Sequence, residues 1–210
     1  RRLLLRRPSG FDLHSVREYE HGDSLRKVHW RSTARRAQLM VKELEDAPRD
    51  EVAVVLDADP EAVVGESFDV QVRAAGSLLL AHVQRGRRAL LVINGAQREH
   101  QGVRSGESDW RAALDLLAAA EPEPGPPLAA LLADENSSVG RALELCVVTA
   151  SLPARLVERL VDRALGSGHV SLVLVDPSSF AGTEPIPRPE LLRLQAAGVA
   201  LVVVRAGDDL

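Results

Sequence analysis

The sequence predicts a doubly wound α/β domain of the Rossmann type with a mostly parallel sheet, preceded by an N-terminal strand-helix-strand extension. From residue 51 onward, short runs rich in Val and Leu alternate with amphipathic stretches. Near-continuous apolar strands joined by helices are typical of parallel sheets covered on both faces. Right-handed crossovers then place helices on both sides of the sheet. We therefore expect an N-terminal arm at residues 1–50 and an α/β domain at residues 51–210.

The strands of the domain are expected where apolar runs are bounded by turn residues. In chain order these runs are 51–56, 88–93, 98–103, 144–149, 170–175 and 199–204. The third run is polar and follows Asn94-Gly95, which is a strong turn signal, so we expect a short edge strand there.

Helices are expected between these strands, and in chain order they cover 68–84, 109–120, 128–143, 153–165 and 189–197. Ser108 is the expected N-cap of the helix at 109–120. The proline-rich segment 121–127 (EPEPGPP) is expected to be a loop, because proline disfavours helix at the residue before it. The following helix is expected to be interrupted near Asn136. Pro153 and Gly166 fit the start and the end of the next helix.

The segment before residue 51 does not follow this alternation. Val16–Glu20 alternates like a strand, Gly22-Asp23 marks a turn, and Ser24–Arg36 is expected to be helical. Residues 38–45 (QLMVKELE) predict a strand leading into the main domain.

Charge is distributed unevenly along the chain. Residues 1–50 hold 12 basic and 8 acidic side chains, whereas residues 51–210 hold 14 basic and 22 acidic ones, so a basic arm precedes an acidic body. Such a body disfavours nucleic acid as a partner, and an anion-binding or nucleic-acid-binding arm is the weakest hypothesis.

Residues 16–36 read VREYEHGDSLRKVHWRSTARR, which contains the run R-x-Y-x-x-G-D-x-x-R-x-x-x-W-x-x-x-A-R. This run resembles the hallmark of the domain of unknown function 58 family. The matched residues are Arg17, Tyr19, Gly22, Asp23, Arg26, Trp30, Ala34 and Arg35. The α/β part is similar to a von Willebrand factor A domain, so the resemblance extends over nearly the whole chain.

The resemblance implies a protein-interaction or assembly module and no established catalytic activity. Full-length members usually carry transmembrane helices upstream and are often associated with AAA+ ATPases of the MoxR type. We therefore expect a MoxR-type partner, a location on the cytoplasmic side of a bacterial membrane, and a chain cut from a longer protein. The sequence contains no P-loop, G-x-S-x-G or H-E-x-x-H motif, which agrees with a protein that is not an enzyme.

The family signature supplies the expected partner-binding residues, which are Arg17, Tyr19, Asp23, Arg26, Trp30, Arg31 and Arg35. If residues 24–36 are helical, Lys27, Arg31 and Arg35 fall on one stripe, where like charges repel unless an anion faces them. Two interpretations stay open: an ion-pair network inside the arm, and a docking surface for an acidic partner or an anion. Trp30 is expected to anchor the core of the arm.

Von Willebrand factor A domains often bind a divalent cation through D-x-S-x-S, a later Thr and a later Asp. Here Asp57, Asp59 and Glu61 occupy the first motif, Ser137 stands in place of the Thr, and Thr149-Ala150 lacks the final Asp. These oxygens suit Mg²⁺, and a metal-dependent ligand-binding domain is the alternative function. Three carboxylates give excess negative charge, however. We expect no cofactor, with Asp57 and Asp59 capping the following segment.

Cys146 is the single cysteine and lies in an apolar run. It is expected to be a buried small hydrophobe rather than a reactive thiol. A lone cysteine excludes an internal disulfide framework and fits a reducing compartment.

Overall fold

A computed structural model describes the chain at 15–18, 30–36, 38–43, 51–104, 107–135, 137–166, 168–181 and 186–209. The chain divides into two compact units, Arg1–Ala47 and Pro48–Leu210. Each unit is described by itself.

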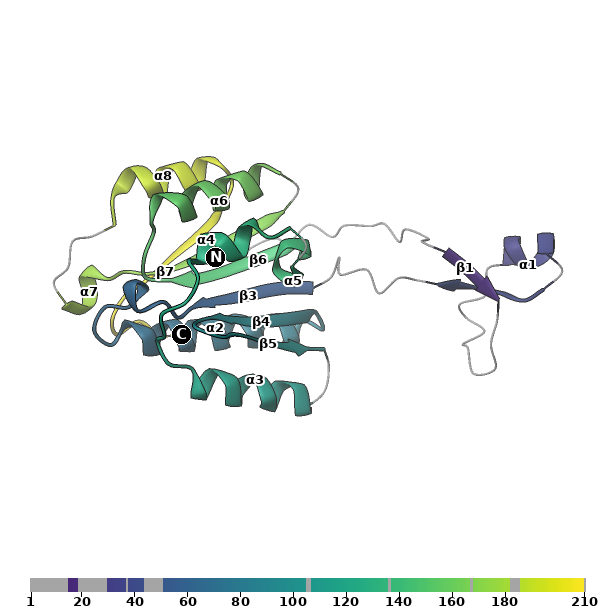
Figure 1. The fold of residues 1–210 in the computed structure, drawn as a ribbon, viewed down its shortest axis with the longest axis horizontal. Helices are drawn as coiled ribbons and strands as arrows, with labels where there is room; N and C mark the ends of the chain where they lie inside the picture. The colour runs from purple at the N-terminus through teal and green to yellow at the C-terminus, as the bar shows by residue number, and fades with distance from the viewer. Residues whose placement is uncertain are drawn as a thin grey trace. The chain divides into compact units, whose positions relative to one another are not determined.

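Among its described residues, the first unit contains a small antiparallel sheet and one helix (Figure 1). Strand β1 (Ser15–Glu18) pairs with β2 (Met40–Glu43), and helix α1 (Trp30–Arg36) lies between them in sequence. The backbone N–H of Met40 donates a hydrogen bond of 3.0 Å to Thr33 Oγ1, which ties the helix to the start of β2. The predicted strand-helix-strand extension is confirmed. The predicted turn at Gly22-Asp23 lies outside the described residues.

The second unit is built on a six-stranded sheet in the order β5-β4-β3-β6-β7-β8. Its strands are β3 (Glu51–Asp57), β4 (Arg88–Asn94), β5 (Arg98–Val103), β6 (Glu144–Thr149), β7 (His169–Val175) and β8 (Ala200–Val204). All neighbouring pairs are parallel except β4 and β5, so β5 is an antiparallel edge strand. The strand order reverses at β3 and β6, as in doubly wound folds. The predicted fold class is confirmed.

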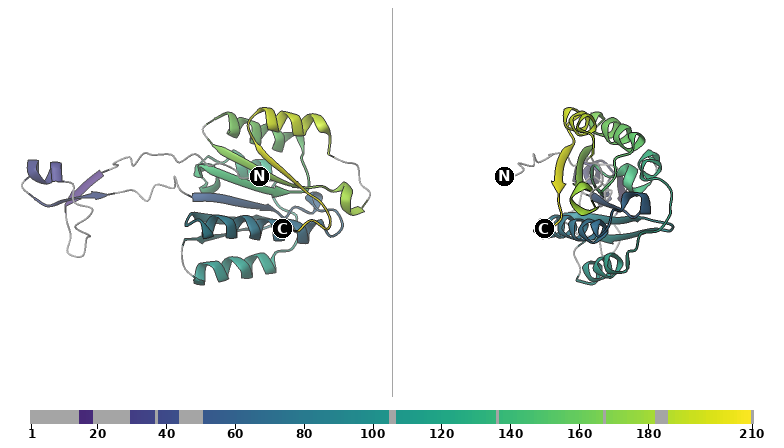
Figure 2. Two further views of the ribbon diagram at one scale, coloured as in Figure 1. Left: turned by 180° about the vertical axis from the view of Figure 1, so that it is seen from behind. Right: turned by 90° about the vertical axis from the view of Figure 1, so that its left-hand side faces the viewer.

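Helices cover both faces of this sheet (Figures 1 and 2). One face carries α2 (Ser67–Gln84) and α3 (Glu107–Ala119). The other carries α4 (Leu128–Ala133), α5 (Ser138–Arg141), α6 (Ala154–Leu165) and α8 (Arg188–Ala196). Two short helices, η3 (Pro60–Ala62) and α7 (Ser178–Ala181), follow the carboxyl ends of β3 and β7. Among the described helices, none has the length and apolar composition that crossing a bilayer would need.

The core consists of two apolar clusters, one on each face of the sheet. Successive side chains of β3 point to opposite faces: Val52, Val54 and Leu56 belong to one cluster, whereas Ala53 and Val55 belong to the other. The central strands are therefore apolar on both sides. This explains why they read as continuous apolar runs instead of alternating ones.

Two details of the second unit differ from the prediction. Helix α3 begins at Glu107, so Ser108 lies in its first turn and the prediction that Ser108 is the N-cap is wrong. Asp109, also in the first turn, accepts a hydrogen bond of 3.2 Å at Oδ2 from the backbone N–H of Arg104. Acidic side chains are favoured in the first turn of a helix because they face its positive end. The short helices η3 and α7 were not predicted, because three or four residues give no periodic pattern.

Candidate functional site

Asp57, Asn94 and Thr149 end three adjacent strands, β3, β4 and β6, at the carboxyl edge of the sheet. Their exposed fractions are 4%, 0% and 0%, although all three are polar. In doubly wound folds, ligands bind beyond this edge, at the point where the strand order reverses. The three residues therefore define the candidate site of the second unit.

The Asp57 carboxylate is held by hydrogen bonds from its own chain. Thr149 Oγ1 donates to Asp57 Oδ2 at 2.8 Å, and the backbone N–H of Asp59 reaches Oδ1 at 3.4 Å. Thr149 Oγ1 also accepts a hydrogen bond of 3.1 Å from the backbone N–H of Ser151. Burial raises the pKa of Asp57 to about 6, and the Thr149 hydrogen bond opposes this rise only in part.

The loop at residues 121–127 closes over this edge. The backbone N–H of Glu123 donates to the carbonyl of Ala58 at 2.9 Å, and Asn94 Nδ2 donates to the carbonyl of Pro126 at 3.1 Å. Gly125 approaches the backbone at Gly95 so closely that no β-carbon would fit there. Asn94 Oδ1 is buried without a hydrogen-bond partner in the described part of the chain. This contribution of the loop was missed, because hydrogen bonds between residues 32 and 65 positions apart leave no local sequence signal.

Asp59 serves as the N-cap of η3, since its Oδ1 accepts a hydrogen bond of 3.0 Å from the backbone N–H of Glu61. This bond confirms the interpretation that Asp59 caps the following segment. Glu61 itself is exposed. The first motif therefore has one carboxylate in a buried hydrogen-bonded position, one in a capping role and one at the surface.

Ser137 lies at the opposite edge of the sheet from Asp57. It is the N-cap of α5, where its Oγ accepts from Gly140 N–H at 2.9 Å and donates to the carbonyl of Asp134 at 2.7 Å. Because α5 precedes β6, which runs parallel to β3, Ser137 stands at the amino end and Asp57 at the carboxyl end. A strand of this length separates them by roughly 20 Å. The prediction that Ser137 belongs to one site with Asp57 is wrong.

The predicted magnesium ligands therefore do not form a ligand set. Ser137 is at the wrong edge, Asp59 is engaged as a cap, and both Asp57 oxygens accept hydrogen bonds from the chain. A hard cation needs several oxygen ligands converging at about 2.0–2.6 Å. The residues present do not fit that requirement.

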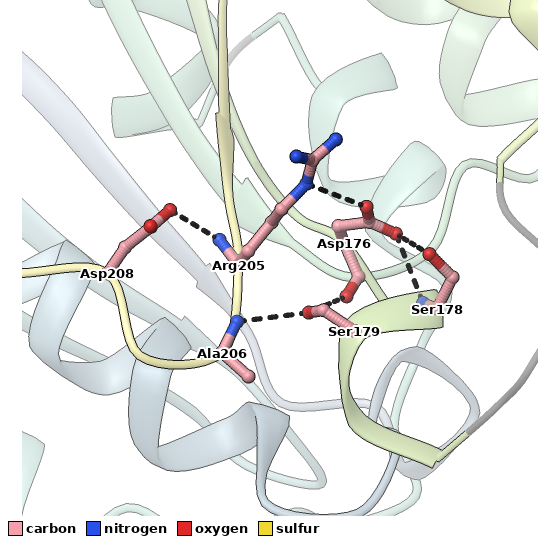
Figure 3. A network of polar contacts seen from close by, with 6 residues as sticks. All are labelled: Asp176, Ser178, Ser179, Arg205, Ala206 and Asp208. Atoms are coloured by element: carbon pink, nitrogen blue, oxygen red, sulfur yellow. Dashed lines mark hydrogen bonds and ion pairs between the residues drawn. The ribbon is translucent and has the colours of Figure 1, made fainter.

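A second polar network joins the carboxyl ends of β7 and β8 (Figure 3). The N–H and hydroxyl of Ser178 donate to Asp176 Oδ1 at 3.1 and 2.7 Å, and Arg205 Nε lies 3.4 Å from Asp176 Oδ2. Ser179 Oγ donates to the Asp176 carbonyl and accepts from Ala206 N–H. The hydrogen bond from Ser178 holds the pKa of Asp176 below its usual value. This network fixes α7 to the chain after β8.

The residues expected to bind a partner lie in the first unit. Trp30 is 69% exposed and begins α1, whereas Met40 is 1% exposed, so the prediction that Trp30 anchors the core of the arm is wrong. Arg35 is exposed near the end of α1. The other expected residues are Arg17 in β1, Arg31 in α1, and Tyr19, Asp23 and Arg26, which lie outside the described residues.

Fold and site thus define a doubly wound α/β domain with a closed carboxyl edge, attached to an arm that carries the sequence signature. The chain belongs to the family described as "Protein of unknown function DUF58", whose model matches residues 15–195. The predicted family is confirmed.

Comparison with known proteins gives further similarities. The "Uncharacterized protein YeaD" of Bacillus subtilis (strain 168) is 26% identical over 162 residues, which are 76% of this chain and 39% of that protein. The chain therefore spans well under half the length of this relative. Two solved structures align at low identity. A "von Willebrand factor type A" from Catenulispora acidiphila is 12% identical, with a TM-score of 0.47 over 75% of this chain and 39% of the other. The conserved hypothetical protein BatB from Bacteroides thetaiotaomicron is 14% identical, with a TM-score of 0.48 over 74% of this chain and 90% of that protein.

Proposed function

We propose that this chain is a non-enzymatic protein-interaction module whose arm docks an AAA+ ATPase of the MoxR type. The choice of partner rests on the family signature at residues 16–36. We further propose that a membrane segment elsewhere in the whole protein holds the module at the cytoplasmic side of a bacterial membrane. The observation that carries the interaction role is the exposure of Trp30.

Trp30 presents a large aromatic surface to solvent, with 69% of it exposed. Tryptophan and arginine are enriched among the few residues that contribute most of the energy of protein interfaces. Arg35 and Arg36 are exposed in the last turn of the same seven-residue helix. A helix that exposes an aromatic side chain at its start and arginines at its end favours a partner that combines an apolar pocket with carboxylates.

The carboxyl edge of the sheet supports a role without catalysis. Thr149 and Asp57 form a hydroxyl–carboxylate pair, but both are buried and closed off by the chain. Ser178 and Asp176 form a second pair, and the lowered pKa of Asp176 makes its carboxylate a weak base. Neither pair combines an accessible nucleophile with a base matched to neutral pH.

Charge reversal in the arm tests the docking role. Arg35→Glu is expected to weaken binding of a purified MoxR-type ATPase at least tenfold in isothermal titration calorimetry, because it places like charges across the interface. Trp30→Ala is expected to weaken binding by a similar factor through loss of the aromatic anchor. Both side chains are exposed, so the thermal midpoint should stay close to that of the unmodified chain.

Arg73→Glu is the matched control, since it makes the same charge change at an exposed position of α2 in the second unit. Binding should be unchanged in this variant. Equal affinity for Arg35→Glu, Trp30→Ala and the unmodified chain would show that the arm does not dock the ATPase.

Magnesium separates the proposal from the alternative function, a metal-dependent ligand-binding domain. Because the residues around Asp57 do not converge as ligands, millimolar Mg²⁺ is expected to leave the thermal midpoint unchanged beyond the effect of a matched concentration of NaCl at equal ionic strength. A rise in the midpoint that Asp57→Ala abolishes would contradict this expectation and support the alternative.

A further inference from the structure

A buried polar cluster lies at the amino edge of the sheet, away from Asp57. His82 comes from the last turn of α2, while Glu144 and Cys146 lie at the start of β6 and point to the same face. Their exposed fractions are 5%, 8% and 1%. One ligand atom from each residue lies within 4.8 Å of the others. Nothing in the proposed docking function uses this cluster.

Two of the three separations are close to those of a tetrahedral metal site. His82 Nε2 lies 3.8 Å from Cys146 Sγ and 4.0 Å from Glu144 Oε1. Metal bonds of about 2.0–2.3 Å at tetrahedral angles place neighbouring ligand atoms roughly 3.3–3.8 Å apart. A contraction of a few tenths of an ångström would therefore bring His82 Nε2 into range of the other two ligand atoms, and the Glu144–Cys146 pair, which lies within 4.8 Å, would have to close by about 1 Å at most. Imidazole, thiolate and carboxylate are the ligand types that zinc takes in proteins.

The surroundings supply hydrogen bonds of the kind that orient metal ligands. Arg87 NH1 binds Glu144 Oε2 at 2.6 Å, which leaves the other carboxylate oxygen, Oε1, facing the cluster. The side chain of Ser171 forms a hydrogen bond with Cys146. Burial keeps the pKa of His82 below its usual value.

One contact has to change when a metal binds. Arg87 NH1 lies 3.3 Å from His82 Nδ1, a nitrogen that must carry a proton once Nε2 ligates a metal. The same NH1 atom bonds Glu144 Oε2 at 2.6 Å, so the guanidinium has to rotate about that bond to move away from the imidazole. The ion also displaces the thiol proton of Cys146, whose pKa burial raises to about 12 in the metal-free chain.

We propose that His82, Glu144 and Cys146 form a buried binding site for a divalent cation of the zinc class. A water molecule completes the tetrahedron. The site joins the end of α2 to the start of β6. Its role is structural, because the three residues are at most 8% exposed.

Cobalt(II) provides a site-specific test, because it binds at zinc sites. A thiolate ligand then gives a charge-transfer absorption band in the near ultraviolet. Cys146 is the only cysteine in the chain, so any such band must come from this position. The chelator-treated chain is titrated anaerobically with Co²⁺ alone. We expect one equivalent to give the charge-transfer band together with the intense visible bands of tetrahedral cobalt, and Zn²⁺ to displace both.

Cys146→Ser should abolish the charge-transfer band, and His82→Gln should weaken cobalt binding at least tenfold. His100→Ala removes an exposed histidine of β5 and is expected to leave the titration unchanged. Circular dichroism in chelator establishes that each variant is folded. The unmodified chain is itself decisive: the absence of a charge-transfer band at millimolar Co²⁺ would overturn the proposal and leave the cluster as an internal ion pair.

Discussion

Arg87→Met is expected to lower the free energy of unfolding by about 3 kcal/mol when measured by urea denaturation in the presence of a chelator. Arg87 NH1 lies 2.6 Å from Glu144 Oε2, and the Glu144 side chain is only 11% exposed. Removing the arginine leaves a buried carboxylate without its cation, and such losses cost about 3–5 kcal/mol. The lower end of that range applies, because Arg87 is itself 27% exposed.

Two further variants separate the ion pair from a general effect of charge. Arg85→Met removes an exposed arginine two residues earlier and should change stability by less than about 0.5 kcal/mol. Arg87→Met combined with Glu144→Gln should recover much of the loss, since no buried charge is then left unpaired. If Arg87→Met were as mild as Arg85→Met, the pair would not stabilise the fold as the geometry indicates.

Asp57→Asn is expected to stabilise the chain at pH 7.5 by about 1–3 kcal/mol. Burial raises the pKa of Asp57 from 3.8 to about 6, so the folded state holds the proton more tightly than the unfolded state. Stability therefore falls as the pH rises from about 4 to about 6, and above pH 6 the full cost of the buried charge is present. A shift of this size corresponds to about 3 kcal/mol. Asparagine removes the charge and keeps an oxygen for the Thr149 hydroxyl.

The pH dependence distinguishes this cause from better packing. The difference between Asp57→Asn and the unmodified chain should be largest at pH 7.5 and should vanish near pH 4, as measured by urea denaturation at both values. Asp69→Asn, an exposed substitution in the first turn of α2, serves as the control. If Asp57→Asn destabilised the chain at pH 7.5, the carboxylate would have a partner that the geometry does not include, such as a bound cation.

The fold followed from the sequence because the local signals and the tertiary structure agree. Strands such as β3 and β6 are apolar on both faces, and helices such as α6 begin after a proline and end before a glycine. Asp57, Asn94 and Thr149 could also be expected at one edge, since carboxyl ends of parallel strands meet there.

The site was less predictable, because its contacts join residues that are distant in the sequence. The motif alone predicts Ser137 beside Asp57, but α5 precedes β6 and so lies at the amino edge of the sheet. The cluster of His82, Glu144 and Cys146 combines a helix end with a strand start 62 to 64 residues later, and no spacing rule connects them. The position of Trp30 depends on which face of a short helix is buried, which seven residues do not determine.

The measurement that tests the central claim most directly is binding of the purified MoxR-type ATPase from the same organism to the 210-residue chain, with and without ATP. The account predicts a saturable complex whose affinity depends on the nucleotide and falls at least tenfold in Trp30→Ala. No complex, or one that binds Trp30→Ala as tightly as the unmodified chain, would contradict a docking role for the arm.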